Sequence, residues 1–336
     1  MEIPYTLPVK AHFTEGTVSR PQTLAALICP YTGVPVDIGL LGVPDDTAVI
    51  QGMGRAGAAF GPTAIRRQCS KYGTRYNLEW KADLASLRIA DFGDLIPDEA
   101  SVEYTHQRLA EAVAAIVKTG AIPVLLGGGH DLTFGGVGGL AKKQQGPIGG
   151  IAIDAHFDVR ETHNGRITSG TPFRNILECI DAMDGERFVE IGVNGWVNAK
   201  EYEDYLNKKG ARIFSLRETR KKGIEAVTDT ALTIAGRGAD RIFCSIDLDG
   251  IAQAFAPGVS APSPTGLWPE EAALAAYLFG LDPKVAYFDI MELNPNFDQD
   301  DRTARLAVAL LLNFLAGVSR RSDPPKGSIG FKGDRP

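Results

Sequence analysis

The chain lacks the features of a secreted, membrane-spanning or nucleic-acid-binding protein. Its 336 residues include only four cysteines, and none forms a CxxC pair, which favours reduced thiols over a disulfide scaffold. The net charge is −6, so no basic field is present to hold nucleic acid. No apolar run approaches the ~20 residues of a transmembrane helix, and the first residues do not resemble a secretory signal. We therefore expect a cytoplasmic protein that binds neither membranes nor nucleic acids.

The composition is that of an ordinary globular protein, with 44% hydrophobic and 23% charged residues. Continuous apolar runs alternate with helical stretches along most of the chain. This alternation is typical of a parallel sheet whose two faces are both covered by helices. Because no convincing linker interrupts it, we predict an α/β fold: one three-layer α/β/α domain around a mostly parallel central sheet.

The individual elements follow from these patterns. We predict strands over 36–44, 86–95, 122–127, 149–154, 187–193, 211–216, 240–249 and 284–290. We predict helices over 61–69, 102–119, 199–209, 223–236, 269–280 and 301–316, and a further helix that starts at Thr133. Residues 1–36 are predicted to form an N-terminal extension, 37–318 the catalytic domain and 319–336 a polar C-terminal tail.

Clusters of acids and histidines follow four of the predicted strands. They are His130 with Asp131, then Asp154, His156 and Asp158, then Asp247 with Asp249, and last Asp289 with Glu292. Ligands of open parallel sheets bind beside the carboxyl ends of strands, which is where all four clusters lie. Buried carboxylates are costly unless a counter-charge pairs with them. The sequence therefore predicts a cationic ligand at this edge of the sheet.

Residue types and spacing indicate that this ligand is a metal pair. Side chains two apart on an extended segment share a face, so Asp154, His156 and Asp158 are expected to converge, as are Asp247 and Asp249. Carboxylates with some imidazole suit Mn²⁺, and two ions about 3.5–4 Å apart generate a hydroxide nucleophile. Each motif alone has a commoner structural explanation, such as a turn or a helix cap, but their joint occurrence argues against it. The predicted metal ligands are His130, Asp154, His156, Asp158, Asp247 and Asp249.

The same blocks carry a resemblance to a known family. "GGGHD", "DAHFD", "SIDLDG…APGVSAPSPTG" and "MELNP" resemble, in order and approximate spacing, the ureohydrolase superfamily of arginases, agmatinases and formimidoylglutamases, over about 36–316. The resemblance implies an arginase-like fold, a small-molecule substrate, and a homo-oligomer, either trimer or hexamer. It also implies two Mn²⁺ ions per subunit, with Ni²⁺, Co²⁺ or Zn²⁺ as alternatives. One ion would be bound by His130, Asp154, Asp158 and Asp247, and the other by Asp154, His156, Asp247 and Asp249.

Catalytic roles follow from the resemblance as well. A hydroxide between the ions would attack the central carbon of a planar C–N group, and Asp158 would orient it. Glu292 would pair with the cationic nitrogens of the substrate. Two positions depart from the common family pattern, since Gly129 stands where many members have aspartate and Asp131 where many have serine. Both changes are expected to alter the surroundings of His130 without removing a ligand.

The segment "SGTPFR" bears on the substrate. Arginase-like and agmatinase-like members carry a proton-shuttling histidine four residues after the serine of "SG", and this chain has Phe173 there. The segment resembles the formimidoylglutamase branch, whose substrate carries two carboxylates. Arg160 and Arg174 are predicted to bind those carboxylates, because guanidinium groups match them bidentately, and Ser169 to donate a hydrogen bond. The predicted reaction is hydrolysis of N-formimidoyl-L-glutamate to L-glutamate and formamide, a step of histidine breakdown.

Several alternatives stay open from the sequence. The chain is compatible with another ureohydrolase, such as an agmatinase, arginase, guanidinobutyrase or guanidine hydrolase. A zinc amide hydrolase is disfavoured by the full ligand set, and a non-catalytic homologue by the absence of any lost ligand. His163 either replaces the missing shuttle histidine or lies on an exposed loop.

Overall fold

The computed structural model describes residues 3–8, 21–143, 146–162 and 165–321. Its central sheet has ten strands: β1 (Thr6–Leu7), β2 (Ile28–Pro30), β3 (Ile38–Val43), β6 (Ile89–Leu95), β7 (Ile122–Gly127), β8 (Ile148–Ile153), β9 (Met183–Val193), β10 (Arg212–Ser215), β11 (Arg241–Asp247) and β12 (Val285–Met291). Their order is β1-β6-β3-β7-β12-β11-β8-β9-β10, with β2 beside β6. Only β1 is antiparallel to its neighbour within this sheet of the described residues. A separate hairpin joins β4 (Tyr76–Asn77) to β5 (Ala82–Asp83).

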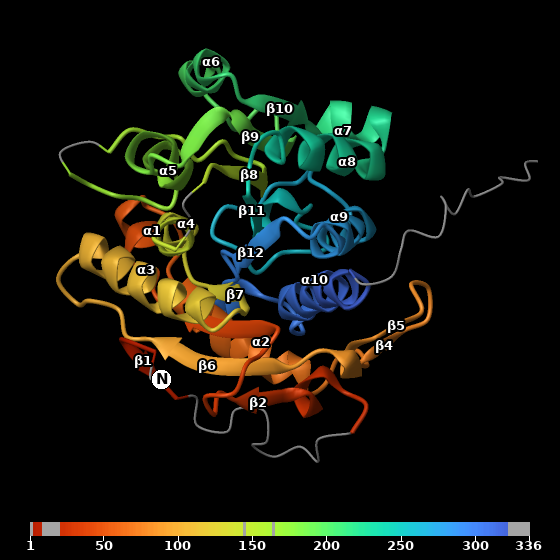
Figure 1. Ribbon diagram of the computed structural model, residues 1–336. Coiled ribbons are helices and arrows are strands. Elements are labelled where there is room, and N and C mark those ends of the chain that lie inside the picture. The colour runs from red at the N-terminus through yellow and green to blue at the C-terminus, as the bar shows by residue number, and fades with distance from the viewer. Residues whose placement is uncertain (1–2, 9–20, 144–145, 163–164, 322–336) are drawn as a thin grey trace, which may run out of the picture.

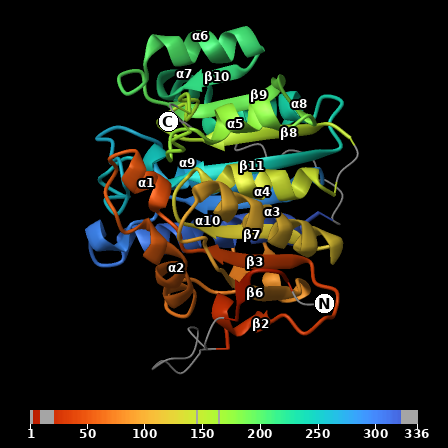
Figure 2. The same ribbon diagram turned by 90° about the vertical axis from the view of Figure 1, so that its left-hand side faces the viewer.

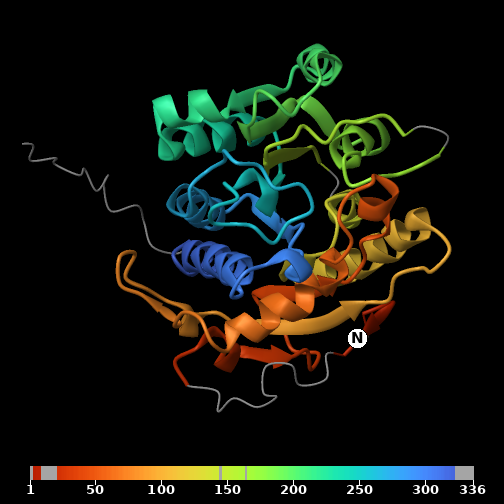
Figure 3. The same cartoon turned by 180° about the vertical axis from the view of Figure 1, so that it is seen from behind.

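Helices cover both faces of the sheet (Figures 1 and 3). They are α1 (Thr47–Gln51), α2 (Gly61–Cys69), α3 (Val102–Lys118), α4 (Leu132–Ala141), α5 (Pro172–Cys179), α6 (Lys200–Lys209), α7 (Leu216–Lys222), α8 (Ile224–Ala235), α9 (Pro269–Leu281) and α10 (Arg302–Ser319). Buried side chains of α3, α4 and α5 pack on one face of the sheet, and those of α2, α8, α9 and α10 on the other. The predicted three-layer α/β/α architecture is therefore confirmed.

The apolar strands form because both of their faces are buried. On β8 every residue is buried, with Ile151 and Ile153 in one hydrophobic cluster and Ala152 in the opposite one. This alternation is the two-residue period of a strand that serves two helical layers at once. The helix α10 alone, among the helices of the described residues, is long and apolar enough to cross a membrane, but 67% of that stretch is buried against the rest of the protein. It is a core helix that packs along α9.

The structure differs from the sequence prediction mainly at the edges. All eight predicted strands are present, but the segment predicted as an N-terminal extension adds β1 and β2 beside β6. The helix predicted over 223–236 is preceded by a second helix, α7, and the chain turns between them at Gly223, whose φ is 85°. The short helices α1 and α5 were not predicted, and most of the predicted tail lies outside the described residues.

The strand order explains how distant motifs meet. The strands β7, β12, β11 and β8 are consecutive neighbours and parallel to one another. Their carboxyl ends therefore lie side by side at one edge of the sheet. Each of the four predicted clusters follows, or ends, one of these strands.

Candidate metal centre

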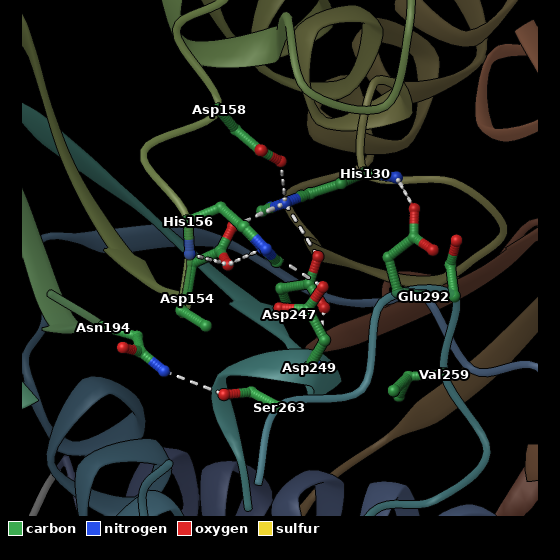
Figure 4. Close-up of polar contacts among 12 residues, drawn as sticks. His130, Asp154, His156, Asp158, Asn194, Asp247, Asp249, Val259, Ser263 and Glu292 are labelled. Atoms are coloured by element: carbon green, nitrogen blue, oxygen red, sulfur yellow. Dashed lines mark hydrogen bonds and ion pairs between the residues drawn. The ribbon is translucent and has the colours of Figure 1, made fainter. Parts of the chain in front are cut away.

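The first group of candidate ligands surrounds the ring of His130, which follows β7 (Figure 4). Its Nδ1 atom lies 3.2 Å from Oδ2 of Asp154, 2.9 Å from Oδ2 of Asp158 and 3.1 Å from Oδ2 of Asp247. All four side chains are buried, and their ligand atoms lie within 4.8 Å of one another. One nitrogen and three carboxylate oxygens at this spacing can bind one divalent cation.

A second group lies directly beside the first. Nδ1 of His156 is 3.3 Å from Oδ1 of Asp154 and 3.3 Å from Oδ2 of Asp249. The two oxygens of Asp154 thus face different histidines, which is the arrangement of a carboxylate that bridges two ions. Asp247 belongs to the first group only, and its Oδ1 accepts a hydrogen bond of 2.7 Å from the backbone N–H of Asp249. Its bridging role stays a prediction.

The electrostatics of the cluster favour cation binding. Burial, reinforced by the nearby Asp154 carboxylate, raises the pKa of Asp247 to about 6. Burial and the Asp247 carboxylate also raise the pKa values of Asp249 and Glu292 well above their usual ranges. Burial acts in the same direction on Asp154, but hydrogen bonds from His130 and His156 outweigh it and lower the pKa of that carboxyl.

Three buried oxygens at the cluster have no hydrogen-bond partner within the described part of the chain. They are Oδ2 of Asp154, which lies 3.2 Å from Nδ1 of His130, Oδ1 of Asp249 and Oε2 of Glu292. Buried polar atoms are nearly always satisfied, so such atoms call for a ligand. Together with four aspartates and two imidazoles, they fit a pair of hard or borderline divalent cations such as Mn²⁺.

The local geometry of the ligands differs from the extended segments that we expected. Asp158 has a φ of 47° and Glu292 a φ of 67°, and Asp249 lies in the 3₁₀ turn Leu248–Gly250. The carboxylates of Asp154 and Asp247 accept hydrogen bonds from the backbone two residues onward, at 2.7 Å each, and so bend the chain inward. Left-handed backbone in residues other than glycine is costly and concentrates at functional sites. Tight turns, rather than strand alternation, bring the side chains together.

A buried hydrogen-bond chain fixes the orientation of His130. Its Nε2 atom lies 2.9 Å from Oγ of Ser245, which in turn donates to Oδ1 of Asp289 at 2.5 Å. Thr133 and Tyr287 both donate to the other oxygen of Asp289. This chain leaves Nδ1 of His130 free for a metal and is the usual support of a histidine ligand. Sequence reasoning placed Asp289 in the cluster but missed its supporting role and Ser245.

A cavity of about 230 Å³ opens onto the ligands. Besides His156, Asp158, Asp247 and Asp249, it is lined by Arg55, Arg160, Ser169, Ser260 and Glu292. Arg160 makes no side-chain hydrogen bond or ion pair with any described residue, and Arg55 contacts only backbone carbonyls of Val259 and Ser260 and the Phe297 ring. Both guanidinium groups therefore lack a carboxylate partner among the described residues, and both line a cavity with four of the candidate metal ligands.

Arg55 was missed from the sequence, whereas Arg174 was predicted and lies elsewhere. Arg174 pairs with Glu161 and Glu178 and lies over the ring of Tyr205. It lines a different cavity, so we do not include it in the substrate site. The signal for Arg55 is its position between glycines after β3, whose carboxyl end lies at the same edge of the sheet.

Glu292 and the loop 251–266 complete the wall of the cavity. Oε1 of Glu292 accepts a hydrogen bond of 2.9 Å from the backbone N–H of His130, which leaves Oε2 for a ligand. The loop is tied to the end of β9 by Asn194, whose Nδ2 donates to Oγ of Ser263 at 2.9 Å (Figure 4). The site is thus assembled from the ends of at least five strands.

Comparison with known proteins agrees with this geometry. Residues 36–317 match the family model described as the arginase family. The chain belongs to the arginase family. The predicted resemblance and the arginase-like fold are therefore confirmed.

Individual relatives within the arginase family share most of the chain. A formimidoylglutamase of Halalkalibacterium halodurans is 31% identical over 95% of this chain and 98% of its own length. A human mitochondrial guanidino acid hydrolase is 31% identical over 90% of this chain and 85% of its own. The crystal structure of Trypanosoma cruzi formiminoglutamase with Mn²⁺ is 33% identical, has a TM-score of 0.83, and covers 89% of this chain and 99% of that one.

The positions that depart from the common arginase-family pattern have a structural explanation. Phe173 is fully buried, packs edge-on against the ring of His130 at 5.1 Å, and contacts Phe188 and Phe243. The phenyl ring of Phe173 has no nitrogen and cannot carry a proton. Asp131 points away from His130 and pairs with His106 at 2.8 Å. The alternative proton carrier, His163, lies outside the described residues.

Proposed function

We propose that this protein is a binuclear manganese hydrolase that converts N-formimidoyl-L-glutamate and water to L-glutamate and formamide. One observation carries the proposal: four of the six candidate metal ligands line a cavity together with Arg55 and Arg160, which have no carboxylate partner among the described residues. The two arginines match the two carboxylates of this substrate. Relatives named formimidoylglutamase support the same choice.

The substrate binds through charge at both ends. The guanidinium groups of Arg55 and Arg160 bind the two carboxylates, and charge-assisted pairs of this kind fix orientation as well as affinity. At the other end, Glu292 accepts hydrogen bonds from the formimidoyl nitrogen through Oε2. Ser169 lines the same cavity and donates a further hydrogen bond.

The chemistry uses the acids around the reacting carbon. Two bound Mn²⁺ ions would supply a hydroxide nucleophile near neutral pH. Asp158 accepts a hydrogen bond from the attacking oxygen and orients it toward the formimidoyl carbon. As the new C–O bond forms, the bond from that carbon to the glutamate nitrogen breaks, and the products are formamide and the free amino group of glutamate.

Asp158 also carries the proton to the leaving nitrogen. Phe173 excludes a shuttle histidine at the usual position, so the proton released by the attacking oxygen needs another carrier. Asp158 lines the cavity, and burial together with the nearby Asp154 carboxylate raises its pKa above the usual range. A carboxylate with a raised pKa is a stronger base than an exposed aspartate, which suits it to accept the proton and pass it on.

A second candidate is hydrolysis of a guanidino acid. The human guanidino acid hydrolase is as similar in sequence as several of the formimidoylglutamases. A guanidino acid also has a cationic end for Glu292 and a carboxylate for one arginine. It leaves the second arginine without a partner, which is why we place it second. The products distinguish the two reactions, because a guanidino acid yields urea.

The test is a substrate panel on Mn²⁺-loaded protein with formamide, urea and ammonia measured separately. We expect formamide from formimidoylglutamate and little urea from arginine, agmatine or guanidinobutyrate. Arg55→Met and Arg160→Met should each raise KM at least about tenfold, the loss of one charge-assisted pair. Arg174→Met is the matched control and should leave KM unchanged. Urea from a guanidino acid alone would overturn the substrate, and full activity without any divalent metal would overturn the mechanism.

We also propose, from family resemblance, that the protein is a homo-oligomer, and from its free cysteines that it acts in the cytoplasm. Cys29, Cys69, Cys179 and Cys244 form no disulfide. Light scattering after size-exclusion chromatography tests for a trimer or hexamer. Localisation of a tagged full-length chain tests the compartment.

A further inference from the structure

One short segment joins the two groups that we assign to opposite ends of the substrate. The strand β12 ends at Met291, Glu292 follows it, and the 3₁₀ turn Pro295–Phe297 comes before α10. In Figure 2, α1 lies at the same edge of the sheet as the blue segment between β12 and α10. This segment contacts Arg55, in the loop after α1, through the side chains of Asn294 and Phe297.

Asn294 fixes the backbone of Arg55. Its side chain is fully buried, and Nδ2 donates hydrogen bonds to the carbonyl oxygens of Arg55, at 2.9 Å, and of Ala56, at 3.0 Å. Its own backbone N–H donates to the carbonyl of Gly258 at 2.7 Å. A residue two positions beyond Glu292 therefore holds both the Arg55 loop and the loop 251–266.

Phe297 supports the guanidinium group of Arg55. Cζ of Arg55 lies 4.0 Å from the centroid of the Phe297 ring, which is the distance of a cation–π contact. The other contacts of this guanidinium are with backbone carbonyls, from Nε to Ser260 at 3.2 Å and from Nη2 to Val259. None of these partners carries a negative charge, so the group keeps its capacity for a charge-assisted pair with a carboxylate.

Core packing does not explain the aromatic side chain of Phe297. It is 41% exposed and belongs to none of the hydrophobic clusters of the described residues. The turn that carries it is nevertheless well fixed, because the next residue, Asp298, accepts hydrogen bonds from the backbone N–H groups of Thr303, at 2.9 Å, and Ala304, at 3.0 Å. The chain thus holds a partly exposed ring in one place, against Arg55.

We propose that Phe297 is a positioning residue for Arg55, and through it for the carboxylate end of the substrate. The ring holds the guanidinium group at a position set by the turn that follows Glu292. This inference rests on the proposed function, because it takes Arg55 as a group that binds a substrate carboxylate. Loss of the ring leaves Glu292 and the metal ligands unchanged, so substrate binding should weaken while the chemical step keeps its rate.

The test compares ring variants of the full-length, Mn²⁺-loaded protein by formamide release from formimidoylglutamate. Phe297→Leu should raise KM about three- to fivefold with kcat unchanged, the loss of one cation–π contact. Phe297→Tyr keeps an aromatic face and should retain the wild-type KM. Phe255→Leu is the matched control, since Phe255 is 40% exposed and no cation of the described residues lies over its ring.

A double variant tests whether Phe297 acts through Arg55. If it does, Phe297→Leu adds nothing once Arg55→Met is present, and the double variant should have the KM of Arg55→Met alone. If Phe297→Leu does not fold, Phe297→Met, which also lacks a ring, replaces it. Multiplied effects in the double variant, a wild-type KM in the folded ring variants, or an equal rise in KM for Phe255→Leu would overturn the proposal.

Failure of the proposed function has a different signature. Urea from 4-guanidinobutyrate, with no formamide from formimidoylglutamate, would overturn the reaction. The same variants would then be compared on 4-guanidinobutyrate, whose single carboxylate also needs a cation, and a rise in KM for Phe297→Leu would uphold its positioning role. An unchanged KM for whichever acid is hydrolysed would overturn that role and leave the reaction standing.

Discussion

Two clusters of buried charged side chains, one around Arg66 and one at the metal centre, neutralise their charge in different ways. Arg66 on α2 is fully buried and donates to both oxygens of Asp91, at 2.8 and 3.0 Å, and to Asp94 at 2.5 Å. Nη2 of Arg66 also donates a hydrogen bond to the backbone carbonyl of Gly93. Every oxygen and nitrogen at the centre of this cluster has a partner supplied by the chain itself.

The metal centre shows the opposite balance. Four aspartates and Glu292 surround only two imidazoles, and three of the carboxylate oxygens have no hydrogen-bond partner within the described residues. Buried carboxylates without counter-charge cost several kcal/mol each. The Arg66 cluster therefore contributes to stability alone, whereas the metal centre needs cations from solution to balance its carboxylates. Four predictions test this contrast, from the largest expected effect to the smallest.

The largest effect is expected from Asp154→Ala. Asp154 is the only residue shared by both candidate ligand groups, so its loss should weaken both ions together. We expect activity to fall more than about 10³-fold, which corresponds to an increase of more than about 4 kcal/mol in the activation free energy. The metal content, measured by atomic emission, should fall below two ions per subunit. Asp204→Ala, on the surface of α6, is the control. A variant that keeps both ions would remove Asp154 from its bridging position.

The next largest effect is expected on stability. Arg66→Met leaves Asp91 buried without its cation, and breaking a buried pair in this way costs about 3–5 kcal/mol. Denaturant unfolding should report that loss, while metal content of the folded protein stays unchanged. Arg88→Met breaks an exposed pair with Asp37 and should cost under about 1 kcal/mol. Equal stability of the two variants would show that Arg66 does not neutralise the buried carboxylates around it, as the metal ions are expected to do at the other cluster.

Metal removal should produce a smaller and pH-dependent change. Mn²⁺ at about 100 times its Kd should stabilise the folded chain by about 2.7 kcal/mol relative to chelated protein. Ligands must be deprotonated to bind metal, and the pKa of Asp247 is raised to about 6 by burial and by Asp154. The metal-dependent gain in Tm should therefore be larger at pH 8 than at pH 5, with a decline as pH falls through about 6. A gain that does not vary between pH 5 and 8 would contradict this assignment.

The smallest effect concerns Glu190 on β9, a third buried charge. Neither of its oxygens has a hydrogen-bond partner among the residues described, and burial, with Asp154 and Asp158 nearby, raises its pKa well above the usual range. A raised carboxyl pKa means that the folded wild type loses stability as pH rises above the ordinary value of 4.5. In metal-free protein, Glu190→Gln removes this loss.

The measurement for Glu190 is a pair of unfolding curves at each pH. The stability of Glu190→Gln relative to wild type should increase with pH by at most about 1.4 kcal/mol per unit, and the two should show no pH-dependent difference below about pH 4. Glu186→Gln is the control, because Glu186 is exposed. A constant difference across the pH range would show that Glu190 is not the titrating group.

Local patterns in the sequence gave the strands correctly because each is a buried, apolar run between helical stretches. The metal ligands could also be predicted from the sequence. His130, Asp154 and Asp247 follow or end strands, and any parallel arrangement brings the ends of those strands to one edge of the sheet. The prediction was less successful where a residue's role depends on its neighbours in space. Arg160 and Arg174 both flank the predicted site in sequence, but Arg174 lies on α5 and pairs with Glu161 and Glu178.

The N-terminal segment illustrates a different limit. Its strands β1 and β2 are two and three residues long, too short to show a periodic pattern. They exist because β6 offers them backbone partners, and no local signal encodes that. The same holds for Ser245, an ordinary strand residue until the order of β7, β12 and β11 places it beside His130.

The sequence by itself determined the fold class, the family and the types of ligand, because these depend on hydrophobic periodicity and on chemically distinctive residues at strand ends. The tertiary structure was needed to show which arginines line the cavity of the candidate ligands, how Asp154 divides its two oxygens, and which described acids are left without partners. The two kinds of information act over different separations along the chain. Hydrophobic periodicity relates residues a few positions apart, whereas electrostatic pairing and hydrogen bonding depend on distances of a few ångströms between residues far apart in the chain.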